Sequence, residues 1–306
     1  MASGNCDNIP TYEKPLDDGE KFLYKSFFPK LDVDTARETS ISTECYNCLA
    51  WTLGITNKWL WPIYHAYLDP TQTTQDDFNR FYHDAGFELT NRSNAEIAAF
   101  GALTKQGKLY MTHGAKIYSK QKDLTDKWES KLGAYIRLEH ELEGLDGDSY
   151  GKPVAFYKKA AHFENVQREA QKRRSNIKKP EFMDIQKLRH KIDGIEPAIV
   201  QEFDANFLNW TENWQDSANE NRLFSSNPAS RAFGDYFLEL IGLGAQADLL
   251  PLVVLRLYTG DFWANLLYDA LQKDESLRVF YGEDCHIFEG EIGRSYKIVE
   301  RYIKAL

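Results

Sequence analysis

Residues 46–54 have the sequence Tyr46-Asn47-Cys48-Leu49-Ala50-Trp51-Thr52-Leu53-Gly54, which places a cysteine where a polar segment turns into an apolar helix. Further along, Thr112-His113-Gly114-Ala115 places a histidine inside an alternating, strand-like run. A helix N-terminus lowers the pKa of a thiol, and a neighbouring imidazole lowers it further. Because the thiolate is the nucleophile in cysteine chemistry, Cys48 and His113 are the first candidates for a catalytic pair.

Helix and strand signals are mixed in the region around this stretch. Residues 75–85 place three aromatic side chains on one helical face, and Gly86 follows as a stop signal. A hairpin turn is predicted at residues 105–108. Strands are expected at residues 98–103, 108–118, 127–132 and 154–157. The region therefore predicts helices packed on an antiparallel sheet, preceded by an irregular lead-in over residues 1–40 with one short amphipathic piece.

In the second half the strand signals vanish and helical periodicity takes over. Pro228 and Pro251 stand at expected helix starts, where proline is tolerated. Helices are expected at residues 162–174, 182–192, 199–214, 230–243, 249–258, 262–271 and 292–303. We therefore expect the α+β fold class with two domains, an α+β domain over residues 1–158 and an all-α helical domain over residues 159–306.

The chain has 306 residues, of which 42% are hydrophobic, and a formal net charge of −9. This length suits one large or two ordinary domains. The acidity disfavours a nucleic-acid-binding function, whose usual footprint is basic. The basic run Gln-Lys-Arg-Arg-Ser-Asn-Ile-Lys-Lys at residues 171–179 is a local exception. It either contacts RNA or another phosphate or, as we favour, forms a solvated linker between helices.

The number of cysteines and the lengths of the apolar runs indicate the cellular compartment in which the protein is expected. Four cysteines are too few for a disulfide scaffold in a chain of this length. Neither a signal-peptide pattern nor an apolar run long enough to span a membrane is present, so we expect a cytoplasmic protein without membrane contact. The sequence contains neither a phosphate-binding loop nor a serine nucleophile elbow, and we expect no cofactor and no metal.

The catalytic pair needs a third polar group that orients the imidazole. Glu129 and Ser130 lie on the next predicted strand and point to opposite faces, so only one of them can reach the site. His140, in a predicted short helix, is a candidate second imidazole, and the Asn47 amide is a candidate for holding an oxyanion. The opposing interpretation is a buried structural Cys48, since free cysteine is among the most buried residue types.

Other interpretations of the residues around Cys48 are weaker but remain open. Cys45 and Cys48 form a C-x-x-C motif, which is typical of a redox pair or half a zinc site, but no second such motif accompanies it. Asp123 and Asp126 are weaker candidates for the third polar group. Aromatic residues are abundant enough to line a pocket, although they more often form core. The substrate-binding candidates are Trp51, Trp59, Trp61, Trp128 and Lys131.

Residues 45–157 resemble a largely uncharacterised family, found mostly in bacteria, with a Tyr-Asn-Cys-x-Ala-Trp pattern near its start. The matching positions are Tyr46, Asn47, Cys48, Ala50, Trp51, Leu53, Gly54, Trp59, Trp61, Pro62, Thr112, His113, Ala115, Trp128, Ser130, Lys131, Leu132, Gly133, His140, Leu142, Leu145, Gly147, Tyr150 and Gly151. The family's cysteine-then-histidine order is similar to that of papain-like amidases and peptidases. This resemblance implies a papain-like α+β domain in which Cys48 is the nucleophile and His113 its base. Ser130 and His140 would be the remaining polar members, although papain-like sites normally use Asn, Asp or His in the third role.

Residues 232–271 resemble a short HEAT-like helical module, which implies partner binding or the capping of a neighbouring domain. Two functions follow. The first is a cysteine-dependent amide hydrolase or acyl transferase that forms a thioester with an amide or ester substrate, either a small molecule or a protein. The second is a non-catalytic protein-binding module with a degenerate papain-like scaffold and a helical interaction domain. A buried Cys48, or side chains of Cys48 and His113 on opposite faces of the sheet, would favour the second.

Overall fold

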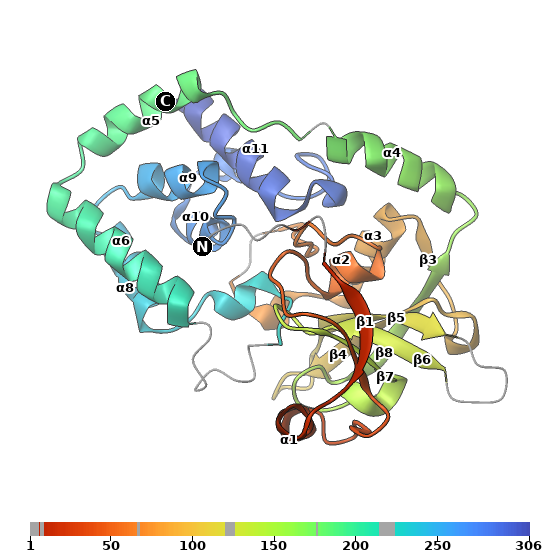
Figure 1. The fold of residues 1–306 in the computed structure, drawn as a ribbon. Coiled ribbons are helices and arrows are strands. Elements are labelled where there is room, and N and C mark those ends of the chain that lie inside the picture. Colours follow the sequence, from red (N-terminus) through yellow and green to blue (C-terminus); the bar gives the residue numbers. More distant parts are fainter. Residues whose placement is uncertain (1–5, 7–8, 66–67, 120–125, 176, 214–223) are drawn as a thin grey trace. The chain divides into compact units, whose positions relative to one another are not determined.

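The computed structural model describes residues 6, 9–65, 68–119, 126–175, 177–213 and 224–306 (Figure 1). The chain divides into two compact units. The α+β unit comprises residues 1–62, 70–170 and 220–227, and the helical unit comprises residues 63–69, 171–219 and 228–306. Asp123, one of the weaker candidates, and Trp214, the predicted end of a helix, lie outside the described residues.

One antiparallel sheet of eight strands, in the order β1-β2-β7-β6-β5-β4-β8-β3, forms the α+β unit. Its strands are β1 (Thr11–Pro15), β2 (Arg37–Ser40), β3 (Phe87–Leu89), β4 (Ile97–Leu103), β5 (Leu109–Ser119), β6 (Lys127–Lys131), β7 (Arg137–Glu141) and β8 (Lys152–Lys159). The predicted α+β class and the β4–β5 hairpin are confirmed.

Helices cover both faces of this sheet (Figure 1). On one face, Phe27 of α1 (Asp18–Phe27) joins a core cluster with Phe100 and Ala115 from the strands. On the other face, α2 (Cys48–Thr52) and α3 (Gln75–Asp84) pack on β5. We call these the α1 face and the α2 face. Because successive side chains of a strand alternate between faces, each strand residue belongs to one of them.

Local signals explain why α3 forms where it was predicted. Thr74 and Asp77 form a capping box at its start, and the chain leaves the helix at Gly86 with φ of 88°. Residues 1–40, predicted to be irregular, instead contain β1, α1 and β2. The predicted amphipathic piece corresponds to α1, but the two strands were missed, because short strands are stabilised by pairing with distant residues, which leaves little local pattern.

His140 lies on a strand, not on the predicted short helix. β7 pairs with β6 on one side and with β2 on the other, with His140 opposite Trp128. Five residues are too few for helical periodicity to be distinguished from the alternation of a strand, and tertiary pairing decided the outcome.

The predicted helical character of the second half is confirmed. Its helices are α4 (Phe163–Ser175), α5 (Phe182–Asp193), α6 (Pro197–Glu212), α8 (Asp235–Gly244), α9 (Leu250–Tyr258), α10 (Ala264–Leu271) and α11 (Gly290–Ala305). Apolar side chains such as Leu257, Leu267 and Val299 form the interior of the helical unit. None of the described helices combines the length and apolar character that crossing a membrane requires.

Candidate functional site

Cys48 is the first residue of α2, and its free thiol is fully buried. The side-chain oxygen of Asn47 caps the helix by accepting a hydrogen bond of 3.2 Å from the Ala50 N–H, so Asn47 holds the helix start. Burial raises the pKa of the Cys48 thiol to about 11, which outweighs the opposing effect of hydrogen bonds with Ser226 and the backbone of Gly114. The thiol is therefore protonated at neutral pH.

Cys48 and His113 lie on opposite faces of the sheet. α2 packs over β5 on the side to which Gly114 points, where an added Cβ would lie 3.0 Å from Leu49 and 2.7 Å from the Tyr82 hydroxyl. His113, one residue earlier, points to the α1 face and stacks on Tyr150, with ring centroids 3.9 Å apart. The structure does not pair the two side chains, because the thiol hydrogen-bonds with Ser226 and the Gly114 backbone, and neither ring nitrogen of His113 has a hydrogen-bond partner among the described residues.

Ser130 and His140, by contrast, do meet, on the α1 face. Nδ1 of His140 donates to the Glu141 carbonyl at 2.7 Å, so the Ser130 hydroxyl donates to Nε2 at 2.9 Å. Burial lowers the pKa of His140 to about 4. It also lowers the pKa of His113 well below the ordinary value, with a smaller contribution from His140. All three side chains are at most 1% exposed, so this arrangement lies inside the core and is closed to substrate.

Glu129 and Ser130 point to opposite faces, as predicted, because Ser130 pairs with Ala115 and Glu129 with Lys116. Glu129 is buried on the α2 face, where it accepts a hydrogen bond from the Thr39 hydroxyl. This contact and the His113 side chain lie on opposite faces of the sheet. Glu129 is therefore not placed to orient that imidazole.

Lys131 and Trp51 also belong to the α2 face. Nζ of Lys131 donates to the carbonyls of Thr43 at 2.9 Å and Gly133 at 2.7 Å, so its charge is held by backbone oxygens. The indole of Trp51 covers the Lys116 ammonium, 3.3 Å from the ring centroid, and the Arg137 guanidinium lies 4.1 Å from the same centroid. Desolvation lowers the pKa of Lys116 to about 8.

The other three tryptophans are buried in different surroundings. Nε1 of Trp59 donates to the Ser226 carbonyl at 3.0 Å, and Nε1 of Trp61 donates to the Thr73 hydroxyl at 3.3 Å. Trp128 belongs to the core on the α1 face. Trp128 therefore lies on the opposite face of the sheet from Trp51.

The C-x-x-C interpretation is wrong, because Cys45 forms a disulfide with Cys6. Cys48 therefore has no redox partner in the motif. Within the described residues, no group of three or more His, Cys, Asp or Glu side chains is arranged to hold a metal ion. The basic run spans the end of α4 and the link to α5, and Lys179 lies over the Tyr258 ring at 4.2 Å. The side chains of residues 174–176 lie outside those described.

A segment that the sequence did not single out, residues 224–227, occupies the space beside Cys48. We call it the 224–227 segment. The Phe224 ring is 1% exposed and fills an aromatic pocket of the α+β unit. Its centroid lies 4.9 to 6.0 Å from the rings of Tyr24, Phe27, Phe28 and Tyr135. The Phe224 carbonyl accepts a hydrogen bond of 2.8 Å from the Tyr150 hydroxyl.

Ser226 is held by residues at the start of α2. Its carbonyl accepts hydrogen bonds from Nε1 of Trp59 at 3.0 Å and from Nδ2 of Asn47 at 3.3 Å. Its hydroxyl accepts the backbone N–H of Cys48 at 3.2 Å. The residue types of this segment did not indicate these contacts, because its partners lie 167 to 179 positions away in the sequence.

Asn227 completes the attachment of the segment. Its Nδ2 donates to the Pro70 carbonyl at 3.3 Å and to the Thr73 hydroxyl at 3.2 Å. The side chain is 3% exposed. A carboxamide at this position therefore donates to one buried and one partly buried acceptor, which an apolar side chain would leave without that donor.

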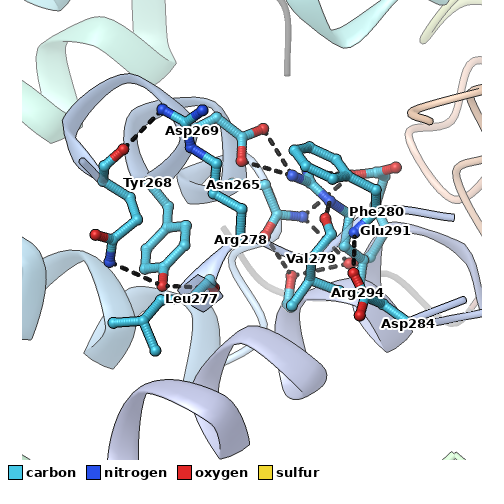
Figure 2. Close-up of polar contacts among 12 residues, drawn as sticks. Asn265, Tyr268, Asp269, Leu277, Arg278, Val279, Phe280, Asp284, Glu291 and Arg294 are labelled. Atoms are coloured by element: carbon cyan, nitrogen blue, oxygen red, sulfur yellow. Dashed lines mark hydrogen bonds and ion pairs between the residues drawn. The ribbon is translucent and has the colours of Figure 1, made fainter. Parts of the chain in front are cut away.

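The helical unit contains a buried polar cluster that the sequence also did not predict (Figure 2). The Arg294 guanidinium donates to both oxygens of Asp269, at 2.6 and 2.7 Å, and to the Val279 carbonyl at 2.9 Å. Glu291 accepts hydrogen bonds from Tyr281 and Asn265. Since each of these charged groups is satisfied within the cluster, it ties α10 and α11 to the segment between them and is not an open site.

The fold and the site define a protein with an antiparallel α+β unit around a buried cysteine and a separate helical unit. Residues 37–158, from β2 to β8, match a family described as "Domain of unknown function (DUF7689)". No curated protein and no solved structure matches the chain, so no named relative supports the papain-like resemblance. The 224–227 segment lies outside the matched residues.

Proposed function

We propose that this chain is a non-catalytic binding protein whose scaffold buries a cysteine that takes no part in nucleophilic chemistry. One observation carries the proposal: the Cys48 thiol hydrogen-bonds with the backbone of Gly114, while His113 points to the opposite face of the sheet, where neither of its ring nitrogens has a hydrogen-bond partner among the described residues. A cysteine nucleophile needs a base within hydrogen-bond reach, about 3 Å, and this scaffold supplies none from His113.

The electrostatics of the thiol support the same conclusion. A thiol with a pKa of about 11 is ionised in only about one molecule in ten thousand at pH 7. Cys48 also has no exposed surface through which an amide or ester carbonyl would approach. Both properties are the reverse of those of reactive cysteines, which are partly exposed in electropositive surroundings.

The test is the rate of iodoacetamide alkylation of each cysteine between pH 6 and 9, determined by mass spectrometry of the folded protein. Cys48 is expected to label as slowly as the other free thiol, Cys285, whose pKa burial also raises. In denaturant both thiols should label rapidly. Fast labelling of Cys48 at pH 6 that slows in a folded His113→Ala variant would instead support the cysteine-dependent hydrolase or acyl transferase.

The binding role suggests where partners should be sought. The helical unit is the proposed place for a protein partner, because residues 232–271 resemble a HEAT-like module. A pull-down with the full chain, compared with variants that carry charge substitutions at exposed residues of α8 such as Leu238 and Glu239, tests that location. An unchanged set of captured proteins would argue against it.

A further inference from the structure

We infer that the α+β unit contains a peptide-binding cradle whose present ligand is the 224–227 segment of the same chain. The cradle comprises the side chains of Asn47, Trp59, Thr73 and Tyr150, the backbone N–H of Cys48, and the aromatic pocket around Phe224. Its ligand class is a peptide with an aromatic residue followed two and three positions later by serine and asparagine. This inference rests on the proposed binding function and names its ligand.

The contacts are of the kind that recognise a peptide main chain. Two carbonyls of the segment, those of residues 224 and 226, accept hydrogen bonds from side chains of the cradle. The Tyr150 hydroxyl, the Trp59 indole and the Asn47 carboxamide each supply a donor to one of these carbonyls. Main-chain contacts give affinity to any extended peptide, and side-chain pockets add selectivity.

Selectivity resides in three side chains of the segment. Phe224 enters the aromatic pocket, where the ring packs edge-on against Phe27. Ser226 accepts the Cys48 N–H, and Asn227 donates to Pro70 and Thr73. Ser225 lies between them and is only partly buried, and its hydroxyl accepts the Asn227 N–H at 3.2 Å within the segment itself.

The polar part of the cradle and its ligand come from different parts of the chain. The donors and acceptors of the cradle all lie within residues 37–158, which match the family of unknown function. The 224–227 segment lies outside that match. The acceptors of the Tyr150 hydroxyl and of the Cys48 N–H are therefore supplied from beyond the matched region, and a buried donor that loses its acceptor is costly.

The test uses the full chain carrying Phe224→Ala, which empties the aromatic pocket, with Phe22→Ala as a matched control. Phe22 lies in the same unit and is 81% exposed. The probe is a synthetic peptide with the sequence of residues 224–231, labelled at its C-terminal end, and a second peptide with alanine in place of its phenylalanine. The readouts are fluorescence anisotropy and the rate of Cys48 alkylation.

Phe224 anchors the segment in the core of the α1 face, and its loss should release Ser226 from the start of α2, so Cys48 should alkylate at least ten times faster in Phe224→Ala than in the wild type or in Phe22→Ala. The probe peptide should bind Phe224→Ala at least ten times more tightly than the wild type, whose cradle is occupied, and should slow the alkylation again. The alanine peptide should do neither. A folded variant that does not bind the probe peptide would overturn the inference.

Circular dichroism establishes whether Phe224→Ala folds, and if it does not, the same titration is made with Phe224→Leu. The two proposals fail in different ways. Loss of peptide binding contradicts the cradle alone. An exposed Cys48 that reacts rapidly at pH 6 contradicts the non-catalytic function, and peptide binding to the same variant would leave the cradle intact.

Discussion

The backbone N–H of Cys48 donates a hydrogen bond of 3.2 Å to the hydroxyl of Ser226, a residue 178 positions later in the chain. The first N–H groups of a helix have no partner within the helix and must be satisfied elsewhere. The segment from the second half of the chain supplies that partner, and it closes the surface at which a cysteine nucleophile would need to meet its substrate.

Replacing Ser226 with alanine should therefore destabilise the α+β unit. The Cys48 N–H would lose its acceptor at a buried position, at a cost of about 1–3 kcal/mol in the free energy of unfolding. Urea denaturation measures the change. Ser93→Ala is the matched control, because Ser93 is exposed and its hydroxyl donates to the nearby Asn91, and it should change stability by less than about 0.5 kcal/mol. Equal stabilities of the two variants would contradict the structural importance of this contact.

Stability should fall as the pH drops below 6.5, because His140 is buried as the neutral imidazole. Its pKa is about 4 in the folded chain, so the unfolded state binds the proton more readily between pH 6.5 and 4. This one group accounts for about 3 kcal/mol lost across that range. Urea unfolding at several pH values should show that the free energy of unfolding of His140→Gln falls less steeply with decreasing pH than that of the wild type.

The control for this pH dependence is His83→Gln, since the His83 side chain is 74% exposed. That variant should reproduce the wild-type pH profile. A His140→Gln profile that also matches the wild type would show that the acid sensitivity arises from other groups, with His113 the next to examine.

Removing Arg294 should destabilise the helical unit strongly. Arg294→Met leaves Asp269 and Glu291 buried without their cation, and breaking a buried ion pair in this way costs about 3–5 kcal/mol. Arg256→Met is the control, because Arg256 pairs with Asp204 at the surface, where such pairs contribute about 1 kcal/mol or less. Thermal and urea unfolding, followed by the circular dichroism of the helices, compare the stabilities of the two variants. Similar losses of stability would contradict the structural importance of the buried cluster.

Two glycine substitutions should have opposite effects on stability, because one glycine lies where α2 approaches β5 closely and the other lies in an open part of α8. Gly114→Ala should destabilise the chain by about 1–3 kcal/mol, because its Cβ would lie 2.7 Å from the Tyr82 hydroxyl and 3.0 Å from Leu49. Gly242→Ala, in α8, meets nothing within 4 Å and should stabilise by up to about 1 kcal/mol. Denaturant midpoints measure both. A neutral Gly114→Ala would mean that α2 is free to move away from the sheet, and the buried state of Cys48 would then be in question.

The sequence by itself determined what short-range patterns control. The capping residues and Gly86 define α3, Gly107 permits the turn of the β4–β5 hairpin, and period-2 alternation sends Glu129 and Ser130 to opposite faces. The placement of Cys48 at the start of a helix belongs to the same group, since Asn47 is a local cap. These features depend on residues within a few positions of one another, so a single sequence carries them.

Only the tertiary structure decided which groups meet. Alternation places His113 on one face of its strand, but it does not say which face α2 will cover. The strand at His140, the disulfide between Cys6 and Cys45, the contacts of Arg294 and the position of Ser226 beside Cys48 all join distant residues. Such pairings are selected by the burial of apolar surface and the satisfaction of buried polar groups across the whole chain, and no local pattern encodes them.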